Sequence, residues 1–171
     1  MPINVLLVED NAGDARLTEE VFRSTSQPVH LHVVSDGTEA MAFLRCEGEY
    51  LYAPRPDLIL LDLNLPKMHG HEVLAQVKSN AELNTIPIIV LTTSDSDGDV
   101  AKSYQLQANC YITKPGQWDA FEIVVKTIHD FWLRAAKLPK QGAGGLKHAG
   151  AKSDFQKFLT VRDKVRDDRE N

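Results

Sequence analysis

The sequence predicts an α/β protein in which five parallel strands form a doubly wound sheet flanked by five helices. Two uninterrupted apolar runs, Leu58–Leu61 and Ile86–Leu91, are short enough for strands, and such runs are typical of strands buried on both faces. Segments with apolar residues at helical spacing alternate with these and other strand-like runs. Strands that alternate with helices in this way form parallel sheets with helices on both faces.

Each predicted element follows from a local pattern. The strands are mainly apolar runs over residues 3–8, 29–34, 58–61, 86–91 and 109–113. The helices are marked by apolar residues at helical spacing: Leu17, Val21 and Phe22; Met41 and Leu44; Val73, Leu74 and Val77; Val100, Ala101 and Tyr104; and a long last helix from about Gln117 to Lys137. Because crossover connections are right-handed, the simplest topology is the flavodoxin-like strand order 2-1-3-4-5.

The composition limits the class of protein. A chain of 171 residues holds one ordinary domain with an appendage, and its 43% hydrophobic and 25% charged residues are typical of a soluble globular protein. The net charge of −5 argues against a nucleic-acid partner, because such binding needs basic patches. With no stretch apolar enough for a membrane and no signal-peptide pattern, we expect a cytoplasmic protein without a membrane partner. Cys46 and Cys110 are expected to be small buried residues of a reducing compartment.

Polar side chains stand at the ends of four predicted strands. Glu9 and Asp10 follow the first strand, Asp62 the third, Thr92 the fourth and Lys114 the fifth. These ends lie at the carboxyl edge of a parallel sheet, where open α/β folds bind their ligands. Alone, each residue has an ordinary interpretation as a helix cap, a turn residue or a surface charge. Their joint occurrence at four strand ends favours a functional site.

The residue types at this edge suit phosphoryl transfer. Carboxylates brought so close repel each other, and Mg²⁺ would stabilise them while leaving room for a phosphate oxygen. Asp62 offers an attacking oxygen, Lys114 a positive charge for the phosphoryl group, and Thr92 a hydroxyl donor. The set therefore predicts metal-assisted, in-line phosphoryl transfer to Asp62.

The motifs that contain these residues resemble the receiver domain of two-component response regulators, from about residue 3 to residue 138. The matching motifs are Val8-Glu9-Asp10, Asp36-Gly37, Leu60-Leu61-Asp62-Leu63-Asn64-Leu65-Pro66, Leu91-Thr92-Thr93 and Tyr111-Ile112-Thr113-Lys114-Pro115. The resemblance implies that Asp62 is the phosphoacceptor and that a sensor histidine kinase or phosphotransfer protein supplies the phosphoryl group. It implies a switch that catalyses its own phosphorylation and dephosphorylation, and not an enzyme with other substrates.

The resemblance also implies a metal site around Asp62. Asp10, Asp62 and the backbone carbonyl of Asn64 would ligate Mg²⁺, and Glu9 would act partly through water. Lys114 would pair with the acidic cluster and, after transfer, with the phosphoryl oxygens.

Three further expectations come from the same resemblance. The Lys114–Pro115 peptide bond is expected to be cis. Thr92 would turn toward the phosphoryl group, and Tyr111 would move inward behind it. Such a pair forms a two-state switch that one charged group biases.

A second, more particular resemblance concerns the partner. The stretches that carry it are Glu9–Thr18, Leu63–Lys67, Thr92–Ser94 and Phe131–Leu133. In these stretches the sequence is similar to the small single-domain regulators paired with bacterial phytochrome histidine kinases. A phytochrome-type histidine kinase is therefore the expected phosphodonor.

The last predicted helix carries more apolar residues than contact with the sheet requires. Its predicted interface residues are Trp118, Phe121, Val125, Ile128, Phe131 and Trp132. Exposed apolar surface of this extent usually marks an interface. We expect the fourth helix, fifth strand and fifth helix to form the face of a symmetric homodimer, as receivers of this kind often do.

The chain divides into three predicted parts. Residues 1–138 form the receiver domain, the Gly- and Ala-rich residues 139–152 a flexible linker, and residues 153–171 a tail with room for one short helix. The tail is too short for a DNA-binding output domain. A disordered tail and a docking helix both remain open.

Two other functions remain as alternatives. An Asp-nucleophile phosphatase would use a similar metal site, but it favours an acid two positions after the nucleophile, where this chain has Asn64. A docking module that never takes up phosphate is the other alternative. The intact set of Asp10, Asp62, Thr92 and Lys114 argues against it.

Overall fold

The structure is a computed structural model that describes residues 2–140 of the chain. Its sheet has five parallel strands in the order β2-β1-β3-β4-β5, which confirms the predicted topology. The strands are β1 (Ile3–Val8), β2 (Val29–Val34), β3 (Leu58–Leu61), β4 (Ile88–Thr92) and β5 (Cys110–Thr113). The α-helices within residues 2–140 are α1 (Ala12–Arg23), α2 (Gly37–Arg45), α3 (Gly70–Ser79), α4 (Asp97–Gln105) and α5 (Trp118–Ile128).

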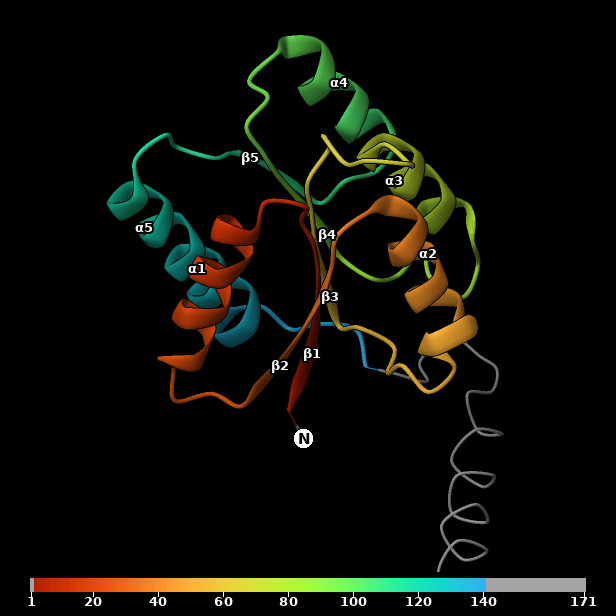
Figure 1. Cartoon of the computed structure of the whole chain (residues 1–171), viewed down its shortest axis with the longest axis horizontal. Helices are drawn as coiled ribbons and strands as arrows, with labels where there is room; N and C mark the ends of the chain where they lie inside the picture. Colours follow the sequence, from red (N-terminus) through yellow and green to blue (C-terminus); the bar gives the residue numbers. More distant parts are fainter. Residues whose placement is uncertain (1, 141–171) are drawn as a thin grey trace, which may run out of the picture. The chain divides into compact units, whose positions relative to one another are not determined.

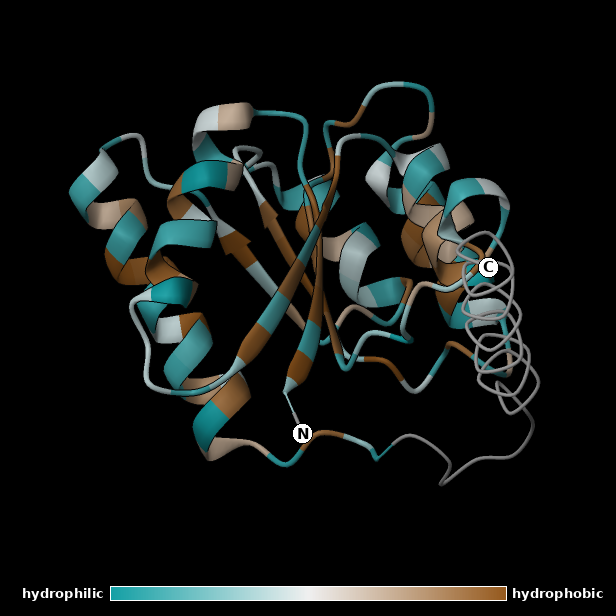
Figure 2. Cartoon of the chain, turned by 60° about the horizontal axis from the view of Figure 1, so that its bottom comes forward, coloured by the Kyte–Doolittle hydropathy of each residue, from teal (hydrophilic) through white to brown (hydrophobic). Residues whose placement is uncertain are grey.

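Helices cover both faces of the sheet, as Figure 1 shows: α1 and α5 lie on one side, and α2, α3 and α4 on the other. The pleat of each strand explains how one sheet serves two cores, because successive side chains point to opposite faces. In β3, Leu58 and Leu60 pack on the α1 and α5 side, whereas Ile59 and Leu61 pack on the other side. Figure 2 shows this as strands that are mostly hydrophobic and helices that alternate between the two colours.

Strand β3 lies at the centre of the sheet and fixes the edge at which the polar residues gather. All four of its residues are fully buried, and full burial of each such side chain contributes roughly 1.5–3 kcal/mol. In the strand register, Val8 pairs with Leu61 and Leu61 pairs with Val90. The residues that follow these strands therefore begin at the same level of the sheet.

The last helix differs from the predicted continuous helix. Helix α5 ends at Ile128, and a π-helical segment, η2 (His129–Ala135), continues it. Within this segment, His129 and Leu133 are both buried, and the His129 ring packs against Phe22 of α1 with ring centroids 5.7 Å apart. Two residues of the π-helical segment are therefore part of the buried interior.

The predicted interface on the last helix is wrong for three of its six residues. Phe121, Val125 and Ile128 are at most 3% exposed and belong to the core between α5 and the sheet. Trp118 and Phe131 are exposed, and Trp132 is half-buried. The physical reason is that residues spaced three and four apart form the helix face that packs on the sheet.

Some predictions fall on or beyond the end of the described residues. The predicted linker at 139–152 and tail at 153–171 lie outside them from residue 141 onward and stay predictions. Cys46 and Cys110 are free thiols that are half-buried and not fully buried as expected. Along residues 2–140 we find no helix with the length and apolar character that a bilayer crossing requires.

Candidate functional site

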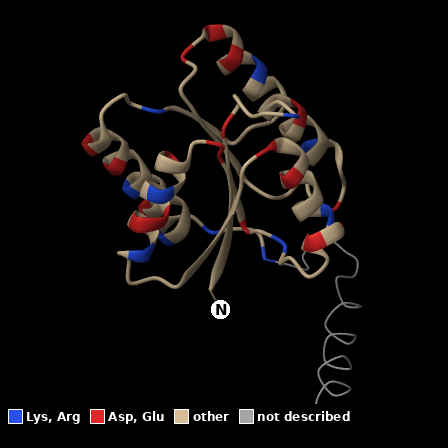
Figure 3. Ribbon diagram, viewed as in Figure 1, with Lys and Arg blue, Asp and Glu red and all other residues tan. Residues whose placement is uncertain are grey.

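The side chain of Lys114 joins three of the predicted strand ends. Lys114 follows β5 directly, and its Nζ donates to Oδ2 of Asp62, which follows β3, at 2.9 Å. It also donates to Oε2 of Glu9, which follows β1. A third bond of 3.0 Å reaches Oδ2 of Asp14, a residue of α1 that the sequence analysis did not include in the site. Figure 3 shows acidic segments gathered where the central strands end.

The acidic residues after β1 and β3 form a cluster that could hold a cation. One carboxylate oxygen from each of Glu9, Asp10 and Asp62 lies within 4.8 Å of the others. Glu9 and Asp62 are buried, and Asp10 is exposed, so the cluster opens to solvent on one side. A donor set made only of oxygens fits a hard divalent ion such as Mg²⁺.

Backbone hydrogen bonds fix Asp62 and the loop after it. The Asp62 N–H donates to the Val8 carbonyl at 3.0 Å, and Oδ1 of Asp62 accepts from the Asn64 N–H at 3.2 Å. Gly70 closes this loop, and a Cβ at that position would lie only 2.3 Å from the Asp62 carbonyl oxygen. A glycine at position 70 is therefore required for the loop to pass so close behind Asp62.

Thr92 and Tyr111 both approach the loop that follows β4. Thr92 is fully buried, and its Oγ1 lies 3.5 Å from the Ser94 N–H. The Tyr111 hydroxyl donates to the Ser94 carbonyl at 2.8 Å, and the Ser94 hydroxyl donates to Asp99 of α4 at 2.5 Å. The two predicted switch residues thus meet at Ser94, which links them to the start of α4.

Burial and charge act in opposite directions on the two central ionisable groups. Burial raises the pKa of Glu9 to about 7, even though the hydrogen bond and charge of Lys114 act to lower it. Burial lowers the pKa of Lys114, but the carboxylates of Glu9 and Asp62 outweigh it, so the pKa of the ammonium is raised. Lys114 therefore keeps a full positive charge beside Asp62 at neutral pH.

Asp14 is the member of the site that sequence reasoning missed. The sequence pattern around Asp14 is typical of a loop that opens a helix. In the structure its N–H donates to the Asn11 side chain, which caps α1, at 3.0 Å. Only the packing of the first turn of α1 over the sheet edge brings its carboxylate to Lys114. No spacing rule in the sequence points to it, because Asp10 precedes the Asn11 cap and does not belong to α1.

The Lys114–Pro115 peptide bond is trans, so the expectation of a cis bond is wrong. Trans is the lower-energy isomer even before proline, by about 0.5–1 kcal/mol.

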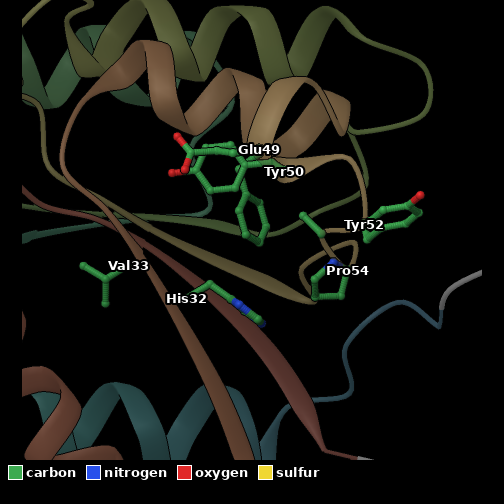
Figure 4. Close-up of a pocket in the computed structure, with 8 residues that line it drawn as sticks. His32, Val33, Glu49, Tyr50, Tyr52 and Pro54 are labelled. Atoms are coloured by element: carbon green, nitrogen blue, oxygen red, sulfur yellow. The ribbon is translucent and has the colours of Figure 1, made fainter. Parts of the chain in front are cut away.

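A shallow pocket of about 390 Å³ lies apart from this cluster. It is lined by residues of β2 and α2 and of the segment before β3, among them His32, Phe43, Tyr50 and Pro54 (Figure 4). None of its lining residues is a member of the carboxylate cluster or a partner of Lys114.

Comparisons with known proteins agree with this geometry. A family model described as the response regulator receiver domain matches residues 5–126. Response regulator Rcp1 of Synechocystis sp. (strain ATCC 27184 / PCC 6803 / Kazusa) is 49% identical over 138 residues, which are 81% of this chain and 94% of that protein.

Two solved structures are similar over nearly the same part of the chain. The phosphorylated cyanobacterial phytochrome response regulator RcpA has 50% identity and a TM-score of 0.80, covering 82% of this chain and 100% of that chain. The Mn²⁺-bound form of response regulator Rcp1 has 48% identity and a TM-score of 0.80, covering 81% of this chain and 100% of that chain.

Proposed function

Because this chain belongs to the response regulator receiver domain family and acts in phosphorylation-based two-component signalling, we propose that Asp62 is its phosphoacceptor. The observation that carries the proposal is the position of the Asp62 carboxylate. It belongs to the cluster of three carboxylates and accepts a 2.9 Å hydrogen bond from Lys114. A nucleophilic oxygen, a cation-binding cluster and a fixed positive charge are the groups that phosphoryl transfer requires.

In the proposed reaction, a carboxylate oxygen of Asp62 attacks the phosphorus of a phosphohistidine. The O–P bond forms while the N–P bond breaks, and the leaving imidazole nitrogen takes the electron pair of that bond. Lys114 holds its positive charge against the phosphoryl oxygens, and Thr92 offers its hydroxyl to one of them. Because the chain supplies these groups, we infer that it catalyses its own phosphorylation and dephosphorylation.

The residues that would hold a divalent ion are Glu9, Asp10 and Asp62, with the backbone carbonyl of Asn64 as a further ligand. We propose Mg²⁺, since the side-chain donors are all carboxylate oxygens. When bound, the ion would neutralise charge on the phosphoryl group. The Mn²⁺-bound form of Rcp1 supports a divalent ion in a relative that is 48% identical.

We propose a phytochrome-type histidine kinase as the phosphodonor. Receiver domains of phytochrome response regulators interact with histidine kinases, and RcpA, at 50% identity, is a phytochrome response regulator.

We also propose that α4, β5 and α5 form a homodimer face. The exposed residues Trp118 and Ile123 of α5 support it, and a light-scattering mass of a monomer at micromolar concentration would contradict it.

The test of the phosphoacceptor uses acetyl phosphate and intact-mass spectrometry, with and without Mg²⁺. We expect wild type to gain one phosphoryl group only with Mg²⁺, and Asp62→Asn to gain none, because the amide is a poor nucleophile. Asp97→Asn is the matched control, because Asp97 is an exposed aspartate at the start of α4. Labelling of Asp62→Asn equal to that of the control would refute the assignment.

The same experiment separates the alternatives. A docking module that takes up no phosphate leaves wild type unlabelled under conditions that label a known receiver. A phosphatase instead releases phosphate continuously from a phosphate ester, with many turnovers per protein.

A further inference from the structure

We propose that Asp14 is a positioning residue that competes with the phosphoryl group for the Lys114 ammonium and so slows the phosphorylation of Asp62. The proposal rests on the function proposed above and concerns the rate of that same reaction. It is carried by the 3.0 Å contact between Asp14 Oδ2 and Lys114 Nζ.

The Lys114 ammonium already uses all of its N–H donors. A lysine ammonium carries three N–H groups, and Lys114 directs them to three carboxylates, those of Glu9, Asp14 and Asp62. The Lys114 side chain is only 3% exposed, so solvent has little access to it. A phosphoryl oxygen that is to bind Lys114 must therefore displace one of these carboxylates.

Asp14 is the carboxylate that can leave most easily. Its side chain is 20% exposed, whereas those of Glu9 and Asp62 are 2% and 7% exposed. Glu9 also accepts a 3.0 Å bond from the Asn11 N–H, and Asp62 is the reacting group itself. Released from Lys114, the Asp14 carboxylate can be solvated by water, while a displaced Glu9 would remain buried and uncompensated.

The backbone of Asp14 is held in place, so its carboxylate stays near the site. Its N–H donates to the Asn11 side chain at 3.0 Å, and its carbonyl accepts from the buried Thr18 hydroxyl at 2.9 Å. The preceding residue, Gly13, lies so close to the Trp118 ring that a Cβ there would be 3.1 Å from it. The first turn of α1 is therefore held in place, and rotation of the Asp14 side chain can release the Lys114 donor without movement of the backbone.

These contacts give Asp14 two effects on phosphorylation by acetyl phosphate. In that reaction an Asp62 oxygen forms the bond to phosphorus, and acetate leaves with the electron pair of the broken P–O bond. The Asp14 charge repels the incoming dianion, and its hydrogen bond holds a donor that the phosphoryl group needs. Both effects slow the reaction, and a neutral side chain removes the repulsion and holds the Lys114 donor less strongly.

The experiment measures the initial rate of phosphorylation with acetyl phosphate and Mg²⁺ for four proteins: wild type, Asp14→Asn, Asp14→Glu and Glu20→Gln. We expect Asp14→Asn to react about five-fold faster, the effect of losing one partly exposed ion pair. Asp14→Glu keeps the charge and should stay close to wild type. Glu20→Gln makes the same change in net charge on the exposed side of α1 and should also stay close to wild type.

A second phosphodonor distinguishes competition from a general structural effect. Phosphoramidate carries less negative charge than acetyl phosphate at neutral pH, so the ratio of the Asp14→Asn rate to the wild-type rate should be smaller with it. A structural effect would give the same ratio for both donors, which would overturn the proposal.

The outcomes separate the two proposals. If wild type is labelled and Asp14→Asn reacts no faster, the role of Asp14 is refuted and the phosphoacceptor remains. If Glu20→Gln accelerates the reaction as much as Asp14→Asn, net charge explains the effect and the role of Asp14 is again refuted. If wild type takes up no phosphoryl group, both proposals fail.

Discussion

Glu9 and Asp36 are two buried carboxylates that lie just beyond neighbouring strands of the sheet, and each contacts a lysine. Their pKa values nevertheless shift in opposite directions. Glu9, beyond β1, is 4% exposed and bonded to Lys114, and burial raises its pKa to about 7. Asp36, beyond β2, is 3% exposed and lies 2.8 Å from Lys67, whose hydrogen bond lowers the pKa of Asp36. Neither the burial of a carboxylate nor its contact with a lysine alone decides whether its pKa rises or falls.

The difference lies in which effect on the pKa is larger: for Glu9 burial outweighs the bonds from Lys114 and Asn11, whereas for Asp36 the hydrogen bond from Lys67 outweighs burial. Lys114 is buried and serves three carboxylates, so the charge of Glu9 is only partly compensated. Lys67 is 68% exposed, and its contact with Asp36 leaves it largely in water. Asp36 also caps α2, accepting from the Glu39 N–H at 2.7 Å, where the helix N-terminus favours negative charge. The surroundings of Glu9 therefore disfavour its charged form, whereas those of Asp36 favour the charged form.

Removal of the buried cation should have the largest effect on stability. In metal-free buffer, Lys114→Met should lower the free energy of unfolding by about 3–5 kcal/mol, because Glu9 and Asp62 would stay buried without a positive partner. Urea unfolding in the presence of EDTA measures this, and added Mg²⁺ should restore part of the loss. Lys67→Met is the matched control and should change stability far less, since Lys67 is exposed. Equal losses in the two variants would show that burial does not separate the two regions.

Removal of Asp36 should have an intermediate effect. Asp36→Ala loses the cap of α2, and we expect a loss of about 1–2 kcal/mol in the free energy of unfolding. Asp36→Asn keeps an oxygen that can accept from the Glu39 N–H and should lose less. If the Asn variant loses as much as the Ala variant, the charge of Asp36 matters and its capping bond does not.

His71 is a third buried ionisable group, and its effect on stability can be measured by changing the pH. His71 of α3 is 4% exposed and hydrogen-bonds to the Ser103 hydroxyl of α4 at 3.0 Å. Burial lowers its pKa below the ordinary 6.5, Lys102 and His69 act in the same direction, and Asp99 opposes them. Because the unfolded chain then binds the proton more readily, the contribution of neutral His71 to stability is present above pH 6.5 and is lost as the pH falls through the folded-state pKa.

Urea unfolding at pH 7.5 and 5.5 tests this sign, with His71→Gln as the partner variant. Wild type should lose more stability on acidification than His71→Gln, which keeps a polar group near Ser103 but does not titrate. Other histidines are common to both proteins and cancel in the difference. Equal losses would mean that burial does not shift the pKa of His71.

The sequence alone determined the sheet and most of the site. The residues of β3, and those of β4 up to Leu91, are apolar on both faces, and a strand buried on both faces admits charged residues only beyond its end. Asp62 therefore had to stand at the carboxyl edge, and parallel strands brought Glu9 and Lys114 to the same edge. The positions of these residues are as predicted, and their chemical roles remain proposals.

Only the tertiary structure decided which contacts these residues make. The hydrogen bond that Lys114 donates to Asp14 depends on how the first turn of α1 packs over the sheet edge. Packing likewise placed Phe121, Val125 and Ile128 in the core and left Trp118 and Phe131 exposed. A periodic pattern specifies that a helix has an apolar face, but the rotation of that helix on the sheet is set by contacts between residues far apart in the chain.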